Sequence, residues 1–496
     1  MTRTVLRVCT LCEATCGLRL TVDGDRVVSV EGDPDDPLSR GFLCAKGAAI
    51  GEVHCDPDRL RAPVRRTGDG RFEPISWDDA LDLAAERIEA TRERYGRDAV
   101  GVYYGNPTVY DHGATLWVSA LLDTLGTRNR FGPNSQDINP RLAASHYLYG
   151  DSWAIPVPDV DRTAYFLCIG ANPVVSNGSL LTAPGLRRRL RSLRERGGML
   201  VVVDPRRSET AAMADRYLAI RPGADAALLL AMLQVLSQRS LLDRRVLDQS
   251  ASGWRELATH LDRFAPERVA HFCGIEARDI EQVAVEFARA ERAVAYGRMG
   301  VSAGHFATLA TWAIDALNVA TGRLGCVGGA MFPRPAIDLT RLLKLAGAAG
   351  HGRWASRVRG LPETVGDLPA AAMAEEIETP GEGRIRTLLT CLGNPVLSVP
   401  DGRRLARALE KLDFMVSVDL YVNETTRHAD LILPPSWHLT HDRCDLVFPL
   451  FSVRNVVRWS PPVFVPREGE LADWQILRAL TERLGGGLAG VRPVDA

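Results

Sequence analysis

The chain has 496 residues, with 60 basic and 61 acidic side chains and a formal net charge of -1. This balance argues against a basic face that neutralises nucleic-acid phosphates, and 10 cysteines are too few for a disulfide scaffold. No apolar run approaches the roughly 20 residues of a membrane helix, and the first residues show no export signal. We therefore expect a cytoplasmic protein of roughly two to four domains, with no nucleic-acid partner and no membrane span.

Three cysteines lie close together near the start of the chain, and a fourth follows after a hairpin pattern. Cys9, Cys12, Cys16 and Cys44 have the spacing C-x2-C-x3-C-x27-C, and apolar residues alternate on both sides of Asp23-Gly24-Asp25. In a reducing compartment, four thiolates hold either one zinc ion or one iron-sulfur cluster. Structural zinc usually takes two C-x2-C pairs, so this spacing favours a [4Fe-4S] cluster. Zinc and plain reduced cysteines are the alternatives.

Two segments in the middle of the chain repeat one pattern in register. "DPRRSETAAMAD" starts at Asp204 and "DLYVNETTRHAD" starts at Asp419, and both read D-x4-E-T-x3-A-D. Each follows an apolar strand with a turn, "YFLCIGANP" or "LLTCLGNP", then a helix and a second strand. This unit is half of a doubly wound α/β fold, so the chain is predicted to contain two such halves.

Folds of this kind bind nucleotides beyond the carboxyl ends of their strands. Turn amides at a helix start receive phosphates, and an aspartate that closes the next strand accepts hydrogen bonds from a ribose or a guanine. The repeat therefore predicts two bound nucleotides, with turn capping by Asp204 and Asp419 as the structural alternative. No G-x-G-x-x-G or G-x4-G-K-[ST] motif occurs at either turn, which argues against an ordinary nicotinamide or ATP site.

Several stretches of the sequence resemble the molybdopterin oxidoreductases, the dimethyl sulfoxide reductase family that includes formate dehydrogenases and assimilatory nitrate reductases. They include "CTLCEATCG", "GFLCAKG", "GANPVVSNGS", "VVVDPRRSET", "RPGADAALLLA", "GNPVLS" and "VSVDLYVNETTRHADLILP". The resemblance implies a [4Fe-4S] cluster on the four cysteines, with Lys46 between the cluster and a pterin. It also implies molybdenum or tungsten held by two molybdopterin guanine dinucleotides. One dinucleotide would contact Asn172, Pro173, Ser176, Asp204, Arg206, Thr210, Gly223 and Asp225, and the other Gly393, Asn394, Asp419 and Thr425.

The metal in this family often takes one side chain from a loop after the first cofactor-binding helix. In "NSQDINPRLAASHYLYG", Asp137 and Arg141 match a D-x3-R-x-ligand pattern that places Ala143 at the ligand position. Alanine cannot coordinate a metal, so formate oxidation by the usual cysteine-histidine or selenocysteine-histidine pair is not expected. Three outcomes stay open: only oxo or hydroxo groups at the fifth position, coordination by Ser145, or no metal. His146 is a candidate acid or base.

The resemblance also implies the architecture, an α/β fold with a small cluster domain that contains β-hairpins and two related doubly wound α/β domains. The cluster domain takes residues 1–60, and the tail 446–496 is expected to pack near it. One α/β domain combines residues 61–130 with 331–445, and the other takes 131–330. The C-terminal β-barrel that closes over both pterins in the family is expected to be absent.

Taken together, these features predict a molybdenum- or tungsten-dependent oxidoreductase subunit that exchanges two electrons with a small-molecule substrate. The electrons would leave one at a time through the cluster to a ferredoxin, a flavoprotein or a quinone-linked partner. The alternative is a non-catalytic relay or structural subunit of the same fold that has lost the metal cofactor. A zinc-binding scaffold is a third reading, and it requires that the cysteines hold zinc.

Overall fold

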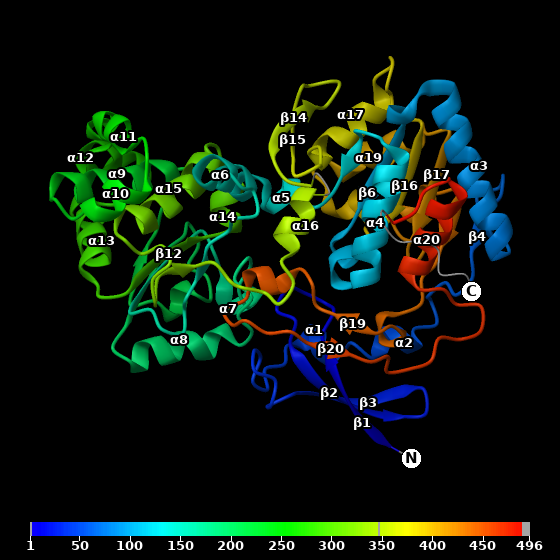
Figure 1. Ribbon diagram of the computed structural model, residues 1–496, viewed down its shortest axis with the longest axis horizontal. Helices are drawn as coiled ribbons and strands as arrows, with labels where there is room; N and C mark the ends of the chain where they lie inside the picture. Colours follow the sequence, from blue (N-terminus) through cyan, green and yellow to red (C-terminus); the bar gives the residue numbers. More distant parts are fainter. Residues whose placement is uncertain (1, 346–347, 489–496) are drawn as a thin grey trace.

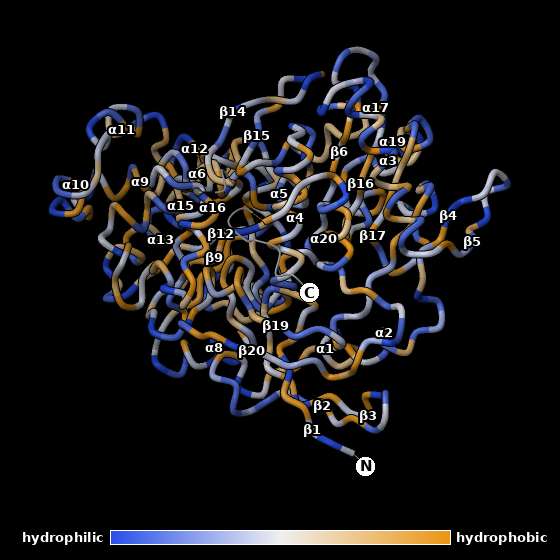
Figure 2. The backbone as a smooth tube through the Cα atoms, turned by 45° about the vertical axis from the view of Figure 1, so that its right-hand side comes forward, coloured by the Kyte–Doolittle hydropathy of each residue, from blue (hydrophilic) through white to orange (hydrophobic). Residues whose placement is uncertain are grey.

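The computed structural model describes residues 2–345 and 348–488. Two α/β lobes lie side by side, and a small β-rich domain at the N-terminus lies below them (Figure 1). Apolar residues concentrate along the interior strands of both lobes, whereas the peripheral hairpin of β4 (Val64–Arg66) and β5 (Phe72–Pro74) is largely hydrophilic (Figure 2). No helix among the described residues is long and apolar enough to cross a membrane.

The N-terminal domain is a three-stranded antiparallel sheet in the order β1-β2-β3. The expected hairpin is confirmed as β2 and β3, which turn at Gly24 with a positive φ of 59°. Cys9 directly follows β1 and Cys16 directly precedes β2, and the Cys9 amide donates to the Cys16 carbonyl oxygen at 2.8 Å. The strands are β1 (Arg3–Val8), β2 (Gly17–Asp23) and β3 (Arg26–Gly32), followed by the short helices α1 (Ala45–Ala48) and α2 (Glu52–Cys55).

The first α/β lobe is built on a parallel sheet in the order β11-β10-β9-β12. Its central strand "YFLCI" is buried throughout, as expected for a strand covered on both faces. The strands are β9 (Tyr165–Ile169), β10 (Met199–Val203), β11 (Arg216–Leu218) and β12 (Ala293–Gly297). The main helices are α6 (Asn139–Tyr149), α8 (Leu186–Glu195), α9 (Asp225–Gln238), α13 (Ala277–Arg289) and α15 (Ala307–Ala320).

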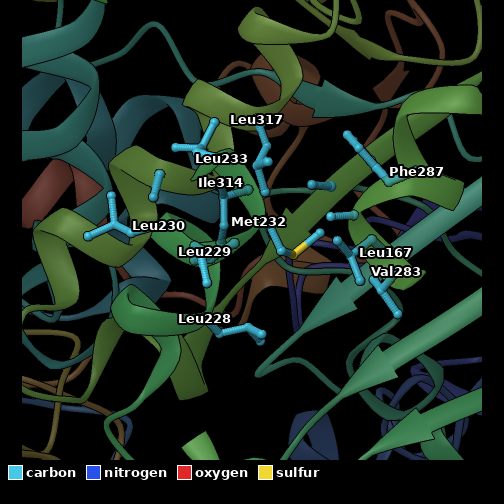
Figure 3. Packing of buried hydrophobic residues seen from close by; sticks show 14 of the residues in the cluster. Leu167, Leu228, Leu229, Leu230, Met232, Leu233, Val283, Phe287, Ile314 and Leu317 are labelled. Carbon is cyan, nitrogen blue, oxygen red and sulfur yellow. The ribbon is translucent and has the colours of Figure 1, made fainter. Parts of the chain in front are cut away.

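Helix α9 forms the centre of this lobe because nearly every side chain along it is apolar and buried. Met232 and Leu233 of α9 pack with Phe287 of α13 and Leu317 of α15 (Figure 3). Truncating one of these buried leucines to alanine generally costs about 2 to 5 kcal/mol. The core thus holds α9 firmly against the sheet, with its first turn at the carboxyl ends of the strands.

The second lobe is built on a seven-stranded sheet in the order β5-β4-β18-β17-β16-β6-β7. It joins strands that precede the first lobe in the chain to strands that follow it. Four of its parallel strands, β18-β17-β16-β6, match β11-β10-β9-β12, except that β6 comes from upstream whereas β12 comes from downstream. The strands are β4 (Val64–Arg66), β5 (Phe72–Pro74), β6 (Val100–Tyr104), β7 (Arg130–Phe131), β16 (Thr387–Cys391), β17 (Phe414–Val418) and β18 (Leu431–Leu433).

The C-terminal segment divides between the two parts of the molecule. Val463 and Phe464 join the apolar core of the N-terminal domain, where the 446–496 tail was expected. The last helix, α20 (Asp473–Arg483), instead packs on α3 (Trp77–Tyr95) and α4 (His112–Leu125) of the second lobe. Its apolar residues explain this position, because Ile476, Leu477 and Leu480 form a buried stripe that fits the core there.

Candidate active site

The four N-terminal cysteines gather below the two lobes. Cys9 and Cys16 are buried, and Cys12 and Cys44 are half-buried. Burial raises the pKa of the Cys9 thiol to about 11, and the adjacent thiols of Cys12 and Cys44 raise it further. Burial also raises the pKa of the Cys12 thiol, and the positive charge of the exposed Lys46 opposes that rise. Lys46 therefore lies close to the Cys12 thiol.

The spacing of the sulfur atoms tests which metal group the thiols fit. Among the residues with described positions, no three of these sulfurs lie within 4.8 Å of one another. A tetrahedral zinc ion with Zn–S bonds of about 2.3 Å would bring its thiolates within roughly 3.8 Å. A Cβ atom at Gly47 would lie 3.9 Å from Cys44 Sγ and 4.0 Å from Cys9 Sγ, so both sulfurs face the start of α1. This wider arrangement fits a cluster of several metal atoms.

In each repeat, the Glu-Thr pair forms hydrogen bonds that connect its loop to the turn after β9 or β16. In the first lobe, the Thr210 hydroxyl donates to Asn172 Oδ1 at 2.8 Å and accepts from the Val174 amide at 3.1 Å. In the second lobe, the Thr425 hydroxyl donates to Asn394 Oδ1 at 2.7 Å and accepts from the Val396 amide at 3.0 Å. The two asparagine amides donate to Glu209 and Glu424 at 2.7 and 2.8 Å. The two halves therefore share one hydrogen-bond network.

The aspartates of the repeat have matching backbone partners. Asp215 and Asp430, which end the repeat, each accept the amide of the second residue of β10 or β17 at 2.8 Å. Asp204 and Asp419, which begin it, each accept an amide two residues ahead. These bonds correspond to the turn-capping alternative. Burial raises the pKa of Asp419 to about 6 and also raises the pKa of Asp204. The hydrogen bonds of the protein therefore do not fully offset the cost of burying either negative charge.

A cavity of about 320 Å³ lies between the cluster loop and the carboxyl ends of β16 and β17. Thr10 and Leu11 come from the cluster loop, and Gly393, Asn394 and Asp419 come from the second repeat. Gly393 allows a close approach here, because a Cβ atom at this position would lie 2.8 Å from the Tyr103 ring. The expected residues of the second nucleotide site thus share one cavity wall with the cluster domain, except Thr425, which is buried beneath it.

Exposed apolar side chains occupy the same position in both repeats. Val175 is 60% exposed and Leu397 is 67% exposed, each three residues after the asparagine of its turn. Each belongs to a short helix, α7 (Pro173–Ser176) or α18 (Pro395–Ser398). The two repeats therefore present an apolar side chain at the same place beside a polar turn.

The other expected contacts of the first nucleotide surround the same strand ends. Asp225 opens α9, and the charge of Asp204 adds to the rise that burial causes in its pKa, so the two carboxylates are close together. Gly223 has a positive φ of 83° and open space around it. Pro173 is buried at the start of α7, whereas Ser176 and Arg206 are exposed. Arg206 is the basic residue among them, and it pairs with Glu209 at 3.4 Å.

A junction near the cluster loop joins four segments of the chain. Glu13, between Cys12 and Cys16, accepts the Leu180 amide at 3.0 Å. Next to it, Arg298 donates to Ser179 Oγ at 2.7 Å and to Asp137 Oδ2 at 2.9 Å. Asp137 ends α5 (Asn134–Asp137), and its side chain is 39% exposed. The junction therefore places an accessible carboxylate close to the cluster loop.

The residues expected around the metal have different surroundings within α6. Ala143 is 5% exposed, so its side chain is buried within the fold. The Ser145 hydroxyl is fully buried, accepts from Arg141 at 2.9 Å and donates to the Ala154 carbonyl oxygen at 2.8 Å. To reach a metal, Ser145 would have to give up both bonds. His146 lies on the far side of this turn, with its ring centroid 6.4 Å from that of His351.

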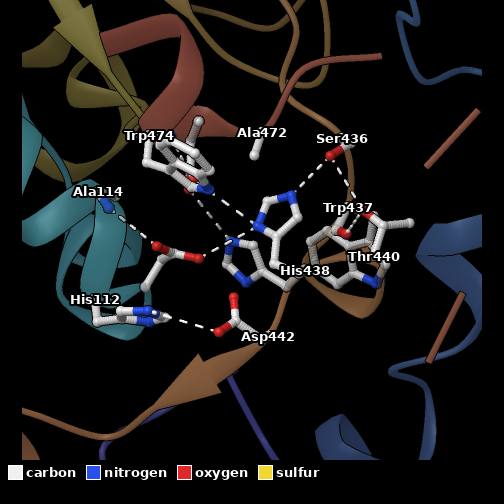
Figure 4. A network of polar contacts seen from close by, with 12 residues as sticks. His112, Ala114, Ser436, Trp437, His438, Thr440, Asp442, Ala472 and Trp474 are labelled. Atoms are coloured by element: carbon white, nitrogen blue, oxygen red, sulfur yellow. Dashed lines mark hydrogen bonds and ion pairs between the residues drawn. The ribbon is translucent and has the colours of Figure 1, made fainter. Parts of the chain in front are cut away.

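A buried network of histidines and carboxylates borders the same cavity as the cluster loop (Figure 4). His441 Nε2 lies 2.7 Å from Ser436 Oγ, and His441 Nδ1 lies 3.3 Å from Asp111 Oδ2 and 3.9 Å from Asp473 Oδ1. Burial opposes both charges, but the bond between them raises the pKa of His441 and holds that of Asp111 well below its usual range. Burial raises the pKa of Asp473 to about 7 and lowers that of His438 to about 3. The network therefore holds an exchangeable proton near neutral pH.

No sequence pattern predicts this network. Asp111 lies in "TVYDHG", and its partners lie more than 300 positions away and share no spacing motif with it. The only local signal was the concentration of histidine between Trp437 and Asp442, which alone predicts no particular contact.

A second cavity, of about 190 Å³, lies between the two lobes. Most of its wall is apolar, with Trp153 on one side and Tyr104 on the other. Asp367 is the buried acid in this wall, and its Oδ2 accepts from the Tyr104 hydroxyl at 2.5 Å and from Asn134 at 3.2 Å. Burial raises the pKa of Asp367 to about 7. This carboxyl group is therefore partly protonated at neutral pH.

The raised pKa of Asp367 predicts a loss of stability at high pH. Below the unfolded pKa of about 3.9, the protonated carboxyl group makes its full contribution to the folding stability. This contribution, up to about 4 kcal/mol, is lost as the pH rises to about 7. Asp367→Asn removes the ionisation and keeps an oxygen for the Tyr104 bond. The thermal unfolding midpoint should fall less between about pH 5 and about pH 8 in the variant than in the wild type. An equal fall of the midpoint in both proteins would show that ionisation of Asp367 does not destabilise the fold.

Comparison with known families identifies the chain through two matches. The family model described as "Molybdopterin oxidoreductase Fe4S4 domain" matches residues 2–54, and the model described as "Molybdopterin oxidoreductase" matches residues 59–483. The chain belongs to the molybdopterin oxidoreductase family. The predicted family and α/β fold class are thereby confirmed, and with them an iron-sulfur cluster and a molybdopterin as the cofactors that this family binds.

Individual relatives of this molybdopterin oxidoreductase cover a range of activities. The chain is 28% identical to a periplasmic nitrate reductase of Desulfovibrio desulfuricans, over 88% of this chain and 60% of that protein. It is 26% identical to formate dehydrogenase H of Escherichia coli, over 97% of this chain and 68% of that protein. The solved acetylene hydratase of Pelobacter acetylenicus shares the fold, with a TM-score of 0.83, 20% identity and coverage of 97% and 69%. The chain thus spans about 60% of the length of the nitrate reductase.

Proposed function

We propose that this chain is the cofactor-binding body of a molybdenum or tungsten bis(molybdopterin guanine dinucleotide) oxidoreductase. The observation that carries the proposal is the cavity whose wall combines the cluster loop with the strand ends of the second repeat. A ligand bound there would lie beside both the cluster and Asp419. The matching network in the first lobe supports a second, related ligand on the other side of the junction.

The residues present suit a pterin dinucleotide at each repeat. The turns after β9 and β16 offer amides for phosphates, and Asp204 and Asp419 offer carboxylate oxygens for a ribose or a guanine edge. Val175 and Leu397 offer exposed apolar surface beside these turns. The bound metal and pterins would supply two-electron chemistry on a small-molecule substrate, and the cluster would supply a one-electron path to a redox partner.

Asp137, rather than Ala143, is the side chain that this chain offers to the metal. Ala143 lies within the helix packing, whereas Asp137 lies at the junction near the cluster loop. Arg298 donates to Asp137 Oδ2 at 2.9 Å, and no other side chain among the described residues is bonded to Oδ1. Arg298 thus orients the carboxylate through Oδ2. The direction of Oδ1 then depends only on the loop that carries Asp137.

An activity assay with an artificial electron carrier tests the proposal. Nitrate and thiosulfate are offered with reduced viologen, and formate with oxidised viologen, because relatives are named for these substrates. At least one reaction is expected, and Asp137→Ala should lower its rate by about 100-fold while bound molybdenum or tungsten is retained. Asp123→Ala, which changes an exposed carboxylate on α4, is the matched control. An Asp137→Ala variant with the wild-type rate would contradict the assignment of the metal-facing side chain.

A further inference from the structure

Arg443 is a buried cation without a hydrogen-bonded partner. Its side chain is 2% exposed, and Nε and both terminal nitrogens are buried with no acceptor among the residues that the structure describes. Asp445 Oδ1 lies 3.8 Å from Arg443, within ion-pair range but beyond hydrogen-bond distance, and Asp445 also pairs with Arg458 at 3.3 Å. A buried charge without hydrogen bonds costs several kcal/mol, so such a group normally has a close counter-charge.

The position of Arg443 places it on the cluster side of the molecule. Arg443 belongs to β19 (Arg443–Cys444), which pairs with β20 (Trp459–Ser460) and sets Arg443 opposite Ser460. Ser460 Oγ accepts the amide of Val8 at 3.1 Å, and Val8 immediately precedes Cys9. The charge of Arg443 accordingly lowers the pKa of the Cys9 thiol, against the larger effect of burial. β19 and β20 lie beside α1, which starts after Cys44 (Figure 1).

Two other buried arginines near the cysteines already have partners. Arg7 donates to the carbonyl oxygens of His438 and His441 at 2.5 and 2.8 Å. Arg458 donates to the Thr15 carbonyl oxygen at 2.6 Å and pairs with Asp36 at 3.2 Å. These two side chains hold the cluster loop in place. Arg443 differs from both, because no described residue accepts a hydrogen bond from its guanidinium group.

We propose that Arg443 is the counter-charge of the iron-sulfur cluster and that it raises the reduction potential of the cluster. This inference rests on the cluster part of the proposed function. Four thiolates leave a [4Fe-4S] cluster with a net negative charge, which grows by one on reduction. A fixed cation in a poorly solvated site stabilises the more negative state more strongly, so it favours reduction.

A redox titration followed by electron paramagnetic resonance of the reduced cluster tests this role. The proteins are the wild type, Arg443→Lys, which keeps the charge, and Arg443→Met, which removes it at similar length. Arg443→Gln replaces the methionine variant if that protein does not fold. Removal of the charge should lower the midpoint potential by about 59 mV or more, a tenfold change in the one-electron equilibrium. The lysine variant should lie closer to the wild type.

Iron and released guanine nucleotide are measured in the same samples. Both should stay at the wild-type level in all variants if Arg443 compensates the cluster. An unchanged potential in the uncharged variant would overturn the proposal. An unchanged potential with loss of nucleotide would assign Arg443 to a dinucleotide phosphate instead. Absence of iron from the wild type would contradict the cluster itself, which separates that failure from a failure of the role of Arg443.

Discussion

Replacing Cys16 with serine is expected to abolish the iron-sulfur cluster. The Cys16 carbonyl oxygen still accepts the Cys9 amide, so the substitution removes the sulfur ligand and leaves the backbone frame in place. Serine is a poor ligand for a cluster that requires four thiolates, and iron should fall from about four to below about one per chain. The measurement is iron content together with the visible absorption of the cluster.

Cys55 provides the matched control for this experiment. It lies at the end of α2 in the same domain, is exposed, and takes no part in the group of four thiols. Cys55→Ser should keep the wild-type iron content. Full iron in the Cys16→Ser protein would mean that the cluster has other ligands, and loss of iron in both variants would indicate general damage to the domain.

Replacing Thr210 or Thr425 with valine is expected to remove bound guanine nucleotide from one half of the molecule. Each threonine is fully buried and makes two hydrogen bonds that valine cannot make, and the Val174 or Val396 amide loses its partner. Each unsatisfied buried group costs about 1 to 3 kcal/mol, which is enough to release the turn that would receive phosphates. Nucleotide should fall from about two to about one per chain in each variant and to about zero in the double variant.

Serine at the same two positions is the control, because it keeps the hydroxyl group and loses only a methyl group. Thr210→Ser and Thr425→Ser should keep nearly all of the nucleotide. If valine at both positions leaves the nucleotide content unchanged, the repeated network braces the loops without supporting a ligand. That result would favour the turn-capping interpretation of the whole repeat.

Local patterns predicted the parts of the fold that depend on short-range chemistry. The cysteine spacing, the turn at Gly24 and the two apolar strands before Asn172 and Asn394 are each visible within about ten residues, and the structure has the corresponding elements in these places. The repeat also predicted two related α/β halves, and the two sheets contain matching parallel strands. It could not show that its Glu and Thr bond to the preceding turn, because that contact forms only when the sheet is assembled.

Features that depend on tertiary packing could not be predicted from the sequence. Asp111, His441 and Asp473 meet only because α20 returns to pack on α4. The orientation of α6 likewise decides the surroundings of the buried Ala143, and an alignment of "D-x3-R" carries no information about that rotation. Arg443 gave no signal as one more basic residue, and its burial without a hydrogen-bond partner among the described residues is visible only in the folded chain.

The measurement that tests the central claim most directly is metal analysis of protein purified without oxygen, with guanine nucleotide released and quantified from the same sample. The account predicts about four irons, about one molybdenum or tungsten and about two GMP equivalents per chain. Four irons with neither heavy metal nor nucleotide would contradict the proposed oxidoreductase and would leave a relay or structural subunit with the same fold.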